Sequence, residues 1–88
     1  MSERFYLYND VEDTKTRFVS FVGENTRFDL AILQSDRHYG KQIVMDLQGS
    51  RFAIIGQDDL KEEGYLEYAF QLSEEDAEEL RQFLYELV

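Results

Sequence analysis

The sequence predicts an α+β domain: an antiparallel β-meander of about five strands, with one C-terminal α-helix packed on one face of the sheet. Three observations lead to this prediction. Apolar and polar residues alternate over residues 14–72, which is typical of half-buried strands. Short turn-forming segments separate these runs, and strands so closely spaced must pair antiparallel, because a parallel return needs a crossover of a dozen or more residues. Over residues 73–88 the apolar spacing becomes helical.

The length and composition of the chain are those of one globular domain. It has 88 residues, of which 43% are hydrophobic and 15% are aromatic. A chain of this size cannot divide into two separate cores, so residues 1–88 are expected to form a single domain. There is no cysteine, which excludes disulfides, thiolate metal ligands and a cysteine nucleophile.

The charge of the chain bears on its partners and its location. The formal net charge is −10, and an acidic surface repels phosphate backbones and anionic lipids, which argues against direct nucleic-acid or membrane binding. No uninterrupted apolar stretch is longer than residues 52–55, far short of the roughly 20 residues of a membrane-spanning helix. The first residues lack the basic and apolar regions of a signal peptide, so we expect a cytoplasmic protein.

Residues 1–13 precede the alternating region and are interpreted as a leader or an edge strand. A short strand is predicted over residues 5–8, where Phe5, Tyr6 and Tyr8 stand close to acidic residues. Two roles stay open for this segment. In the first, the segment is an edge strand that docks on the sheet through its aromatic rings. In the second, it is a mobile segment that binds a partner.

The first predicted hairpin joins strands over residues 15–22 and 27–34, with Glu24 and Asn25 in the turn. Its register depends on the length of the loop, because a slip of one residue moves every side chain to the other face. An even-numbered loop gathers an apolar set on one face, and we prefer this register for that reason. The set is Val19, Phe21, Phe28, Leu30 and Ile32.

The second predicted hairpin joins strands over residues 41–48 and 51–57. Its Gly49-Ser50 loop suits a two-residue type II′ turn, in which glycine takes the first central position. The pairs that this turn predicts are Leu47 with Phe52, Met45 with Ile54, Asp46 with Ala53 and Val44 with Ile55.

Residues 58–64 are predicted to form a charged loop and residues 65–72 a fifth strand. The helix is expected to begin after Ser73, with Asp76 three positions further on in the manner of a capping box. Acidic residues in its first turns complement the partial positive charge of a helix N-terminus. Its apolar face is expected to consist of Ala77, Leu80, Phe83, Leu84 and Leu87.

One helix is too narrow for the predicted sheet. Five strands at about 4.8 Å make a sheet roughly 24 Å wide, whereas a helix about 10 Å across shields two or three strands on one face. The second face also carries apolar residues, so it needs cover from curling of the sheet, from the N-terminal segment or from another chain. We favour a homodimer or another protein partner. The residues expected to carry this interface are Phe18, Leu33, Val44 and Ile55.

Residues that could carry chemistry have simpler structural explanations. His38 is the single histidine, is expected in an exposed turn, and cannot form a histidine-based metal site alone. The acids of residues 58–64 lack the ligand spacing of a calcium loop, and those of the C-terminal helix are expected to face water alike. No phosphate-binding, zinc-protease or hydrolase motif is present. We therefore predict no catalytic residue, no metal site and no cofactor, and favour a protein that is not an enzyme.

Three segments resemble a known family. They are FVSFVGENTRFDLAI from Phe18, RFAIIGQDDL from Arg51 and LSEEDAEELR from Leu72. Together they are similar to a family of short acidic cytosolic proteins from Gram-positive bacteria of the Bacillus and Staphylococcus type, catalogued as a domain of unknown function. The resemblance covers nearly the whole chain. It implies the bacterial cytosol and an α+β fold, and it brings no catalytic or binding residue with it.

The sequence leaves the function unknown, since no motif specifies it. We favour a non-enzymatic accessory or protein-interaction domain that self-associates through its sheet face. One alternative is an acidic mimic that occupies a nucleic-acid-binding protein, which the net charge supports. Another is a small-ligand binder with a pocket between sheet and helix, lined by Tyr65, Tyr68 or Tyr39.

Overall fold

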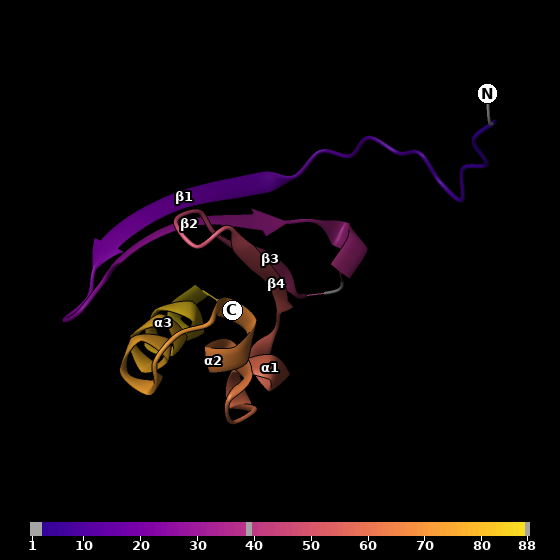
Figure 1. Cartoon of the computed structure of the whole chain (residues 1–88). Helices are drawn as coiled ribbons and strands as arrows, with labels where there is room; N and C mark the ends of the chain where they lie inside the picture. The colour runs from indigo at the N-terminus through magenta and orange to yellow at the C-terminus, as the bar shows by residue number, and fades with distance from the viewer. Residues whose placement is uncertain (1–2, 39, 88) are drawn as a thin grey trace.

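The computed structural model describes residues 3–38 and 40–87, and within them the chain forms an α+β fold. Four strands form one antiparallel sheet in this described part, in the order β1-β2-β3-β4. The elements are β1 (Lys15–Val22), β2 (Arg27–Gln34), the 3-10 helix η1 (Asp36–His38), β3 (Gln42–Asp46), β4 (Arg51–Ile55), α1 (Gln57–Lys61), α2 (Tyr65–Phe70) and α3 (Glu74–Leu87). Figure 1 shows α1, α2 and α3 on one side of the sheet. The predicted class and meander are confirmed, but the prediction of about five strands is wrong.

The first hairpin has the predicted bounds and the predicted register. Phe21 pairs with Phe28, and Val19 pairs with Leu30. The rings of the two phenylalanines stack with their centroids 4.9 Å apart. The turn lies over residues 23–26, an even number, so the apolar set shares the face that meets the helices.

The second hairpin does not have the predicted two-residue turn at Gly49-Ser50. Asp46 pairs with Arg51 rather than with Ala53, so the loop is longer and the register is shifted by two residues. The carboxylate of Asp46 accepts the backbone N–H of Gly49 at 3.2 Å, which stabilises the longer turn. Ser50 takes the left-handed conformation in it, with φ of 58°. A shift of two residues keeps each side chain on its predicted face of the hairpin.

The predicted fifth strand is wrong, because Tyr65–Phe70 forms helix α2. Leu66 and Phe70 are 0% and 3% exposed, whereas Tyr68 between them is 81% exposed. A strand would place all three side chains on one face. A spacing of four residues fits one face of a helix as well as one face of a strand, and in this segment the helical alternative holds.

Helix α1 occupies most of the region that was predicted to be a charged loop. Leu60 within it is 1% exposed and belongs to the core. The backbone N–H of Gly56 donates to a carboxylate oxygen of Asp59 at 2.8 Å, which fixes the start of the helix. The acid also lies 3.2 Å from the ammonium group of Lys41. Charged residues surround Leu60 in the sequence, so the local pattern gave no sign that this leucine is buried.

Helix α3 confirms the predicted C-terminal helix. The hydroxyl of Ser73 accepts the backbone N–H of Asp76 at 3.2 Å and so caps its first turn. Ala77, Leu80 and Leu84 are buried, each at no more than 1% exposure. These residues recur at helical spacing, so one stripe of α3 faces the sheet.

The hydrophobic core lies between the sheet and the helices. It is drawn from the helix-facing side of the strands and from the buried stripes of α1, α2 and α3. Its buried members are Phe28, Leu30, Ile32, Val44, Ile55, Leu60, Leu66, Phe70, Ala77, Leu80 and Leu84. Short helices α1 and α2 thus supply the cover that a single helix could not give to this side of the sheet.

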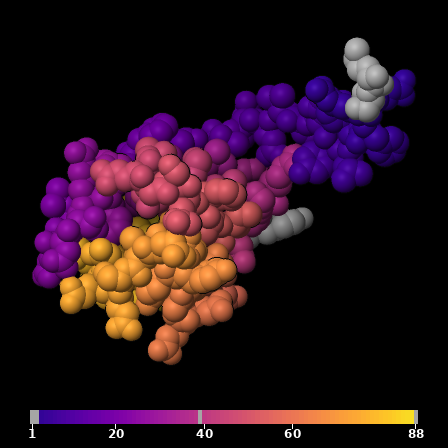
Figure 2. Space-filling view, in the orientation of Figure 1, coloured from indigo at the N-terminus to yellow at the C-terminus, as the bar shows by residue number. Residues whose placement is uncertain are grey.

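Residues 3–14 contain no helix or strand in the part of the chain that the structure describes, and we call them the N-terminal arm. The arm leaves the start of β1 and projects from the body of the molecule (Figures 1 and 2). Phe5, Leu7 and Val11 are 91%, 88% and 100% exposed. The alternative of an edge strand docked by its rings is therefore wrong for this chain by itself.

Candidate functional site

The side of the sheet opposite the helices carries two rows of side chains that cross all the strands. Directly paired residues of neighbouring strands share a face, so the register defines each row. The first row is Phe18, Ala31, Met45 and Phe52. The second row is Thr16, Leu33, Ile43 and Ile54. We call the two rows together the open face.

Large apolar side chains of the open face are in contact with solvent. Phe18 is 75% exposed, Phe52 is 67% exposed and Ile54 is 36% exposed. Leu33 is half-buried, and Ala31 is covered by the larger side chains around it, with 2% exposure. Within the described residues no helix packs on this side (Figure 1), so no other element of the chain covers the open face.

A polar network bounds the open face toward the β1–β2 turn. The carboxylate of Asp29 accepts a hydrogen bond of 2.6 Å from the Ser20 hydroxyl. Arg27 lies 3.2 Å from the same oxygen, and the side-chain amide of Gln48 donates to the other one. The Ser20 hydrogen bond, followed by the charge of Arg27, lowers the pKa of Asp29 below its ordinary value. Asp29 thus stays ionised and marks the edge of the apolar surface.

The structure divides the four predicted interface residues into two pairs. Phe18 and Leu33 lie on the open face, as expected. Val44 and Ile55 do not, because they are 1% and 0% exposed within a single chain and belong to the core. Val44 pairs with Ile32 on the helix-facing side, so the prediction that it lies on the uncovered side is wrong.

Arg37 of η1 clamps the second half of the N-terminal arm. Its guanidinium contacts the carboxylate of Glu12, lies 3.0 Å from that of Asp10, and stacks 4.9 Å from the ring centre of Tyr8. The hydrogen bonds that Arg37 donates to Glu12 and Asp10 raise its pKa. Three alternate side chains of the arm therefore turn toward one arginine, as they do in an extended chain.

Acidification is expected to release this half of the arm. The hydrogen bond from Ser35, followed by that from Arg37, lowers the pKa of Glu12 from its ordinary value of 4.5. The folded pKa lies below the unfolded one, so the stabilising contribution is fully present above the unfolded pKa and is lost as pH falls through the folded pKa. An NMR titration of the Glu12 carboxyl, followed together with the Val11 amide, measures both events. In Ser35→Ala the pKa of Glu12 should move back toward 4.5, and an unchanged pKa would contradict the assignment.

The other residues considered for chemistry have structural roles or lie apart. His38 ends η1, and its carbonyl accepts the backbone N–H of Lys41 at 3.0 Å. Tyr65 donates its hydroxyl to the carbonyl of Ile54 at 3.4 Å, whereas Tyr68 points into solvent. These two tyrosines do not line one pocket, and Tyr39 lies outside the described residues. In residues 3–38 and 40–87 no three acidic or histidine side chains are placed to hold a metal ion.

Two acids of α3 hold the β1–β2 turn against the helix. Both carboxylate oxygens of Glu79 accept the backbone N–H of Glu24, at 3.0 and 3.1 Å. Glu75 accepts the side-chain amide of Asn25 at 2.9 Å. A Cβ at Gly23 would stand 1.8 Å from Glu79, so glycine is needed for this close approach. The acids of α3 therefore do not all face water alike, and two of them belong to the framework.

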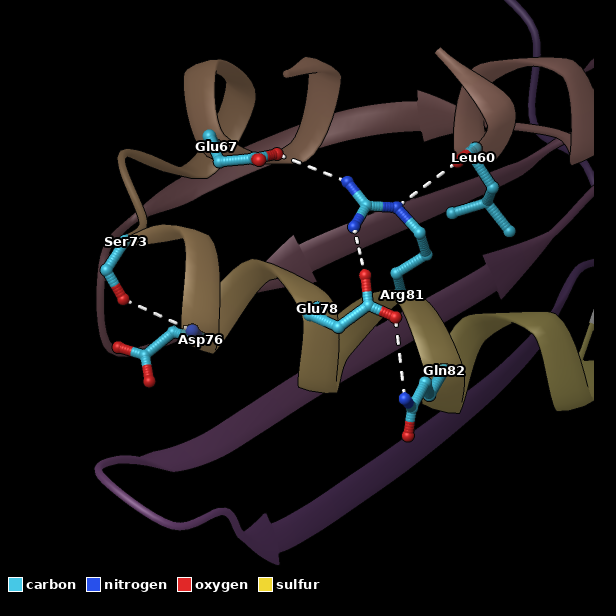
Figure 3. A network of polar contacts seen from close by, with 7 residues as sticks. All are labelled: Leu60, Glu67, Ser73, Asp76, Glu78, Arg81 and Gln82. Carbon is cyan, nitrogen blue, oxygen red and sulfur yellow. Dashed lines mark hydrogen bonds and ion pairs between the residues drawn. The ribbon is translucent and has the colours of Figure 1, made fainter. Parts of the chain in front are cut away.

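Arg81 joins α1, α2 and α3 (Figure 3). Its guanidinium donates to the carbonyl of Leu60 at 3.2 Å, to Glu67 at 3.2 Å and to Glu78 at 2.7 Å. The Arg81 side chain is 16% exposed. Its three partners are satisfied within the chain, so the network has a structural role.

Sequence reasoning missed both Arg37 and Arg81. Arg81 offered a signal, because it is the single basic residue in an otherwise acidic helix and stands beside apolar Leu80. An isolated arginine among acids can form charge-assisted hydrogen bonds with several carboxylates. Arg37 offered none, since its partners are 25 and 27 residues away in the chain.

Fold and surface define the class of the protein: a small α+β domain with an open apolar sheet face. The chain belongs to the SAV0927-like family, which its sequence matches over residues 7–86. That family is small and uncharacterised, as the resemblance implied, and its bacterial origin stays a prediction. No curated protein matches the sequence. Among the described residues, none of the helices is long and apolar enough to cross a bilayer.

Proposed function

We propose that the protein is a non-enzymatic interaction domain that self-associates through the open face of its sheet. The observation that carries this proposal is the exposure of Phe18 and Phe52 in one continuous row across the strands. The largest exposed apolar patch of a small soluble protein is often a site of protein contact. A cytoplasmic location is part of the same proposal.

A second copy is the occupant that the open face suits best. An isologous contact needs one surface that is complementary to itself, and an apolar sheet face meets this need without matching charges. The bound Asp29 network lies to one side, so two open faces can meet without burying an unpaired carboxylate. The helix acids are partly used inside the chain, which weakens the support for an acidic mimic.

The size of the open face predicts a weak contact. Four strands at about 4.8 Å and two rows at about 7 Å give an area of roughly 300 Å². A stable interface of standard size uses about 800 Å² on each partner. The open face alone is therefore expected to give a transient dimer, unless another part of the chain adds to it.

Replacing Phe52 by aspartate is expected to weaken this dimer. An aromatic side chain buried in an interface contributes about 2 kcal/mol or more, so the dissociation constant should rise by at least about thirtyfold. Sedimentation equilibrium over a range of concentrations measures the change. The matched control is Tyr68→Asp, since Tyr68 is 81% exposed on α2, away from the sheet. Equal dissociation constants for Phe52→Asp and Tyr68→Asp would contradict the role of the open face.

A further inference from the structure

The free edge of β1 carries two cations that have no ion-pair partner among residues 3–38 and 40–87. Strand order places β1 at the border of the sheet, with β2 on one side. Its residues Lys15 and Arg17 are exposed, and neither has an ion-pair partner within the described residues. Edge strands also present unpaired backbone N–H and C=O groups, which favour the addition of another strand.

The N-terminal arm has the alternation of a strand. Its odd-numbered residues Phe5, Leu7 and Val11 are almost fully exposed. Its even-numbered acids Asp10 and Glu12 turn together toward Arg37. The odd-numbered side of the arm is thus apolar and exposed to solvent. The even-numbered side is acidic in its last residues, just before β1 begins.

We propose that the arm of one copy adds as an antiparallel strand to the β1 edge of a second copy. In the register that fits best, the acids of the arm meet the free cations of the edge. The predicted pairs, arm residue first, are Phe5 with Val22, Tyr6 with Phe21, Tyr8 with Val19, Asp10 with Arg17, and Glu12 with Lys15. Cross-strand pairs of opposite charge and of apolar side chains both stabilise such a sheet.

Neighbouring registers fit less well. A shift of two residues in one direction sets Glu12 opposite Asp13 of the other copy, which places like charges together. The opposite shift leaves Asp10 beside Val19 and carries Phe5 beyond the end of β1. A shift of one residue turns Asp10 and Glu12 to the open-face side, away from both cations. The charges therefore select one register.

The same register closes into a twofold dimer. When Asp10 of one copy faces Arg17 of the other, Arg17 of the first faces Asp10 of the second, so both arms exchange at once. Residues 5–12 and residues 15–22 have equal length, about 26 Å when extended, so the arm covers the whole edge. The Arg37 clamp holds the acids in place beforehand and lowers the ordering cost of docking.

Arm exchange goes beyond the proposed function, because it uses the edge of the sheet and holds even if the open face stays bare. It also places Phe5 and Val11 beside the open face, which enlarges that surface. The two contacts are tested separately by variants on opposite borders of the sheet, since Phe52 lies on β4 and Arg17 on β1.

Charge exchange between two versions of the full chain tests the arm. One version carries Lys15→Glu and Arg17→Glu, and the other carries Asp10→Lys and Glu12→Lys. Each alone should dissociate at least about tenfold more readily than the natural chain, because its own arm and edge now repel. The two mixed should form a heterodimer, which native mass spectrometry or sedimentation detects. A mixture that stays monomeric, or single versions that dimerise as the natural chain does, overturns the proposal.

A cysteine pair tests the register itself, and the natural chain has no cysteine to interfere. Val11 and Thr16 are both exposed and lie opposite each other across the proposed contact. Val11→Cys with Thr16→Cys should give a covalent dimer under mild oxidation, and Val11→Cys with Phe18→Cys should give at least about tenfold less. Equal yields overturn the register. An unchanged dissociation constant in Phe52→Asp, with the cross-link of Val11→Cys and Thr16→Cys retained, would count against the open face and leave arm exchange standing.

Discussion

Replacing Ile55 by aspartate is expected to unfold the domain, whereas the same change at the next residue, Ile54, should leave the fold intact. Ile55 is 0% exposed in the core between sheet and helices, and Ile54 is 36% exposed on the open face. The buried change removes apolar contacts and places a carboxylate in the hydrophobic core. Its cost of at least about 5 kcal/mol matches the entire stability of a small domain.

Far-UV circular dichroism and thermal unfolding compare the two variants directly. Ile55→Asp should show little helix signal and no cooperative transition at neutral pH. Ile54→Asp should unfold cooperatively within a few degrees of the natural chain, since a surface change away from the core costs about 0.5 kcal/mol or less. A cooperatively folded Ile55→Asp would mean that this side chain lies on the open face after all.

The bounds of the first hairpin were predictable because its signals are local, whereas its register rested on a preference for the even-numbered loop. The turn over residues 23–26 is short, and an even loop length is the one that gathers Val19, Phe21 and Phe28 on one face. Helix α3 was predictable for a similar reason. Its cap at Ser73 and its apolar stripe lie within one continuous segment.

The placement of Val44 and Ile55 could not be predicted in the same way. Each hairpin fixes which of its own side chains share a face, but the connection over residues 35–41 decides how the faces of the two hairpins match. In the structure Ile32 pairs with Val44, which puts the second hairpin's Val44 face toward the helices. A connection that is longer or shorter by one residue would turn the opposite face of the second hairpin toward the helices. No local pattern in residues 35–41 specifies this parity.

Helix α2 escaped prediction because its apolar residues fit two periods at once. Leu66 and Phe70 satisfy the spacing of a strand face and of a helix face equally. Tertiary packing favours the helix over the strand, since α1 and α2 together bury Leu60 and Leu66 against the sheet. Tertiary contacts of this kind are not visible in a segment of six residues.

The candidate surface lies on the side of the sheet opposite the helices. The helix-facing side of the sheet is covered within one chain, so it needs no partner. The uncovered side keeps Phe18 and Leu33 and gains Phe52 and Ile54. Because the arm's apolar residues and the β1 cations lie at the same border of the sheet, the strongest self-contact is expected there and not at its centre.

Arg81→Met is expected to lower the stability of the protein by about 2–3 kcal/mol. Methionine keeps the apolar stem of the side chain but removes the donors to the Leu60 carbonyl and to Glu67. Glu67 is 26% exposed, so part of the lost interaction is recovered by water, and the cost stays below that of a fully buried pair. The midpoint of thermal unfolding should fall by roughly 8–20 °C in a domain of this size.

Two comparisons separate the network from the general loss of a surface charge. Glu78→Gln removes the more exposed partner, at 54% exposure, and is expected to cost about 0.5 kcal/mol or less. Arg81→Met combined with Glu67→Leu should recover part of the stability lost in Arg81→Met, because no carboxylate is then left without its cation between α2 and α3. If the double variant is as unstable as the sum of its single changes, the pairing of Arg81 with Glu67 contributes little, and the loss in Arg81→Met comes from its other hydrogen bonds, such as that to the Leu60 carbonyl.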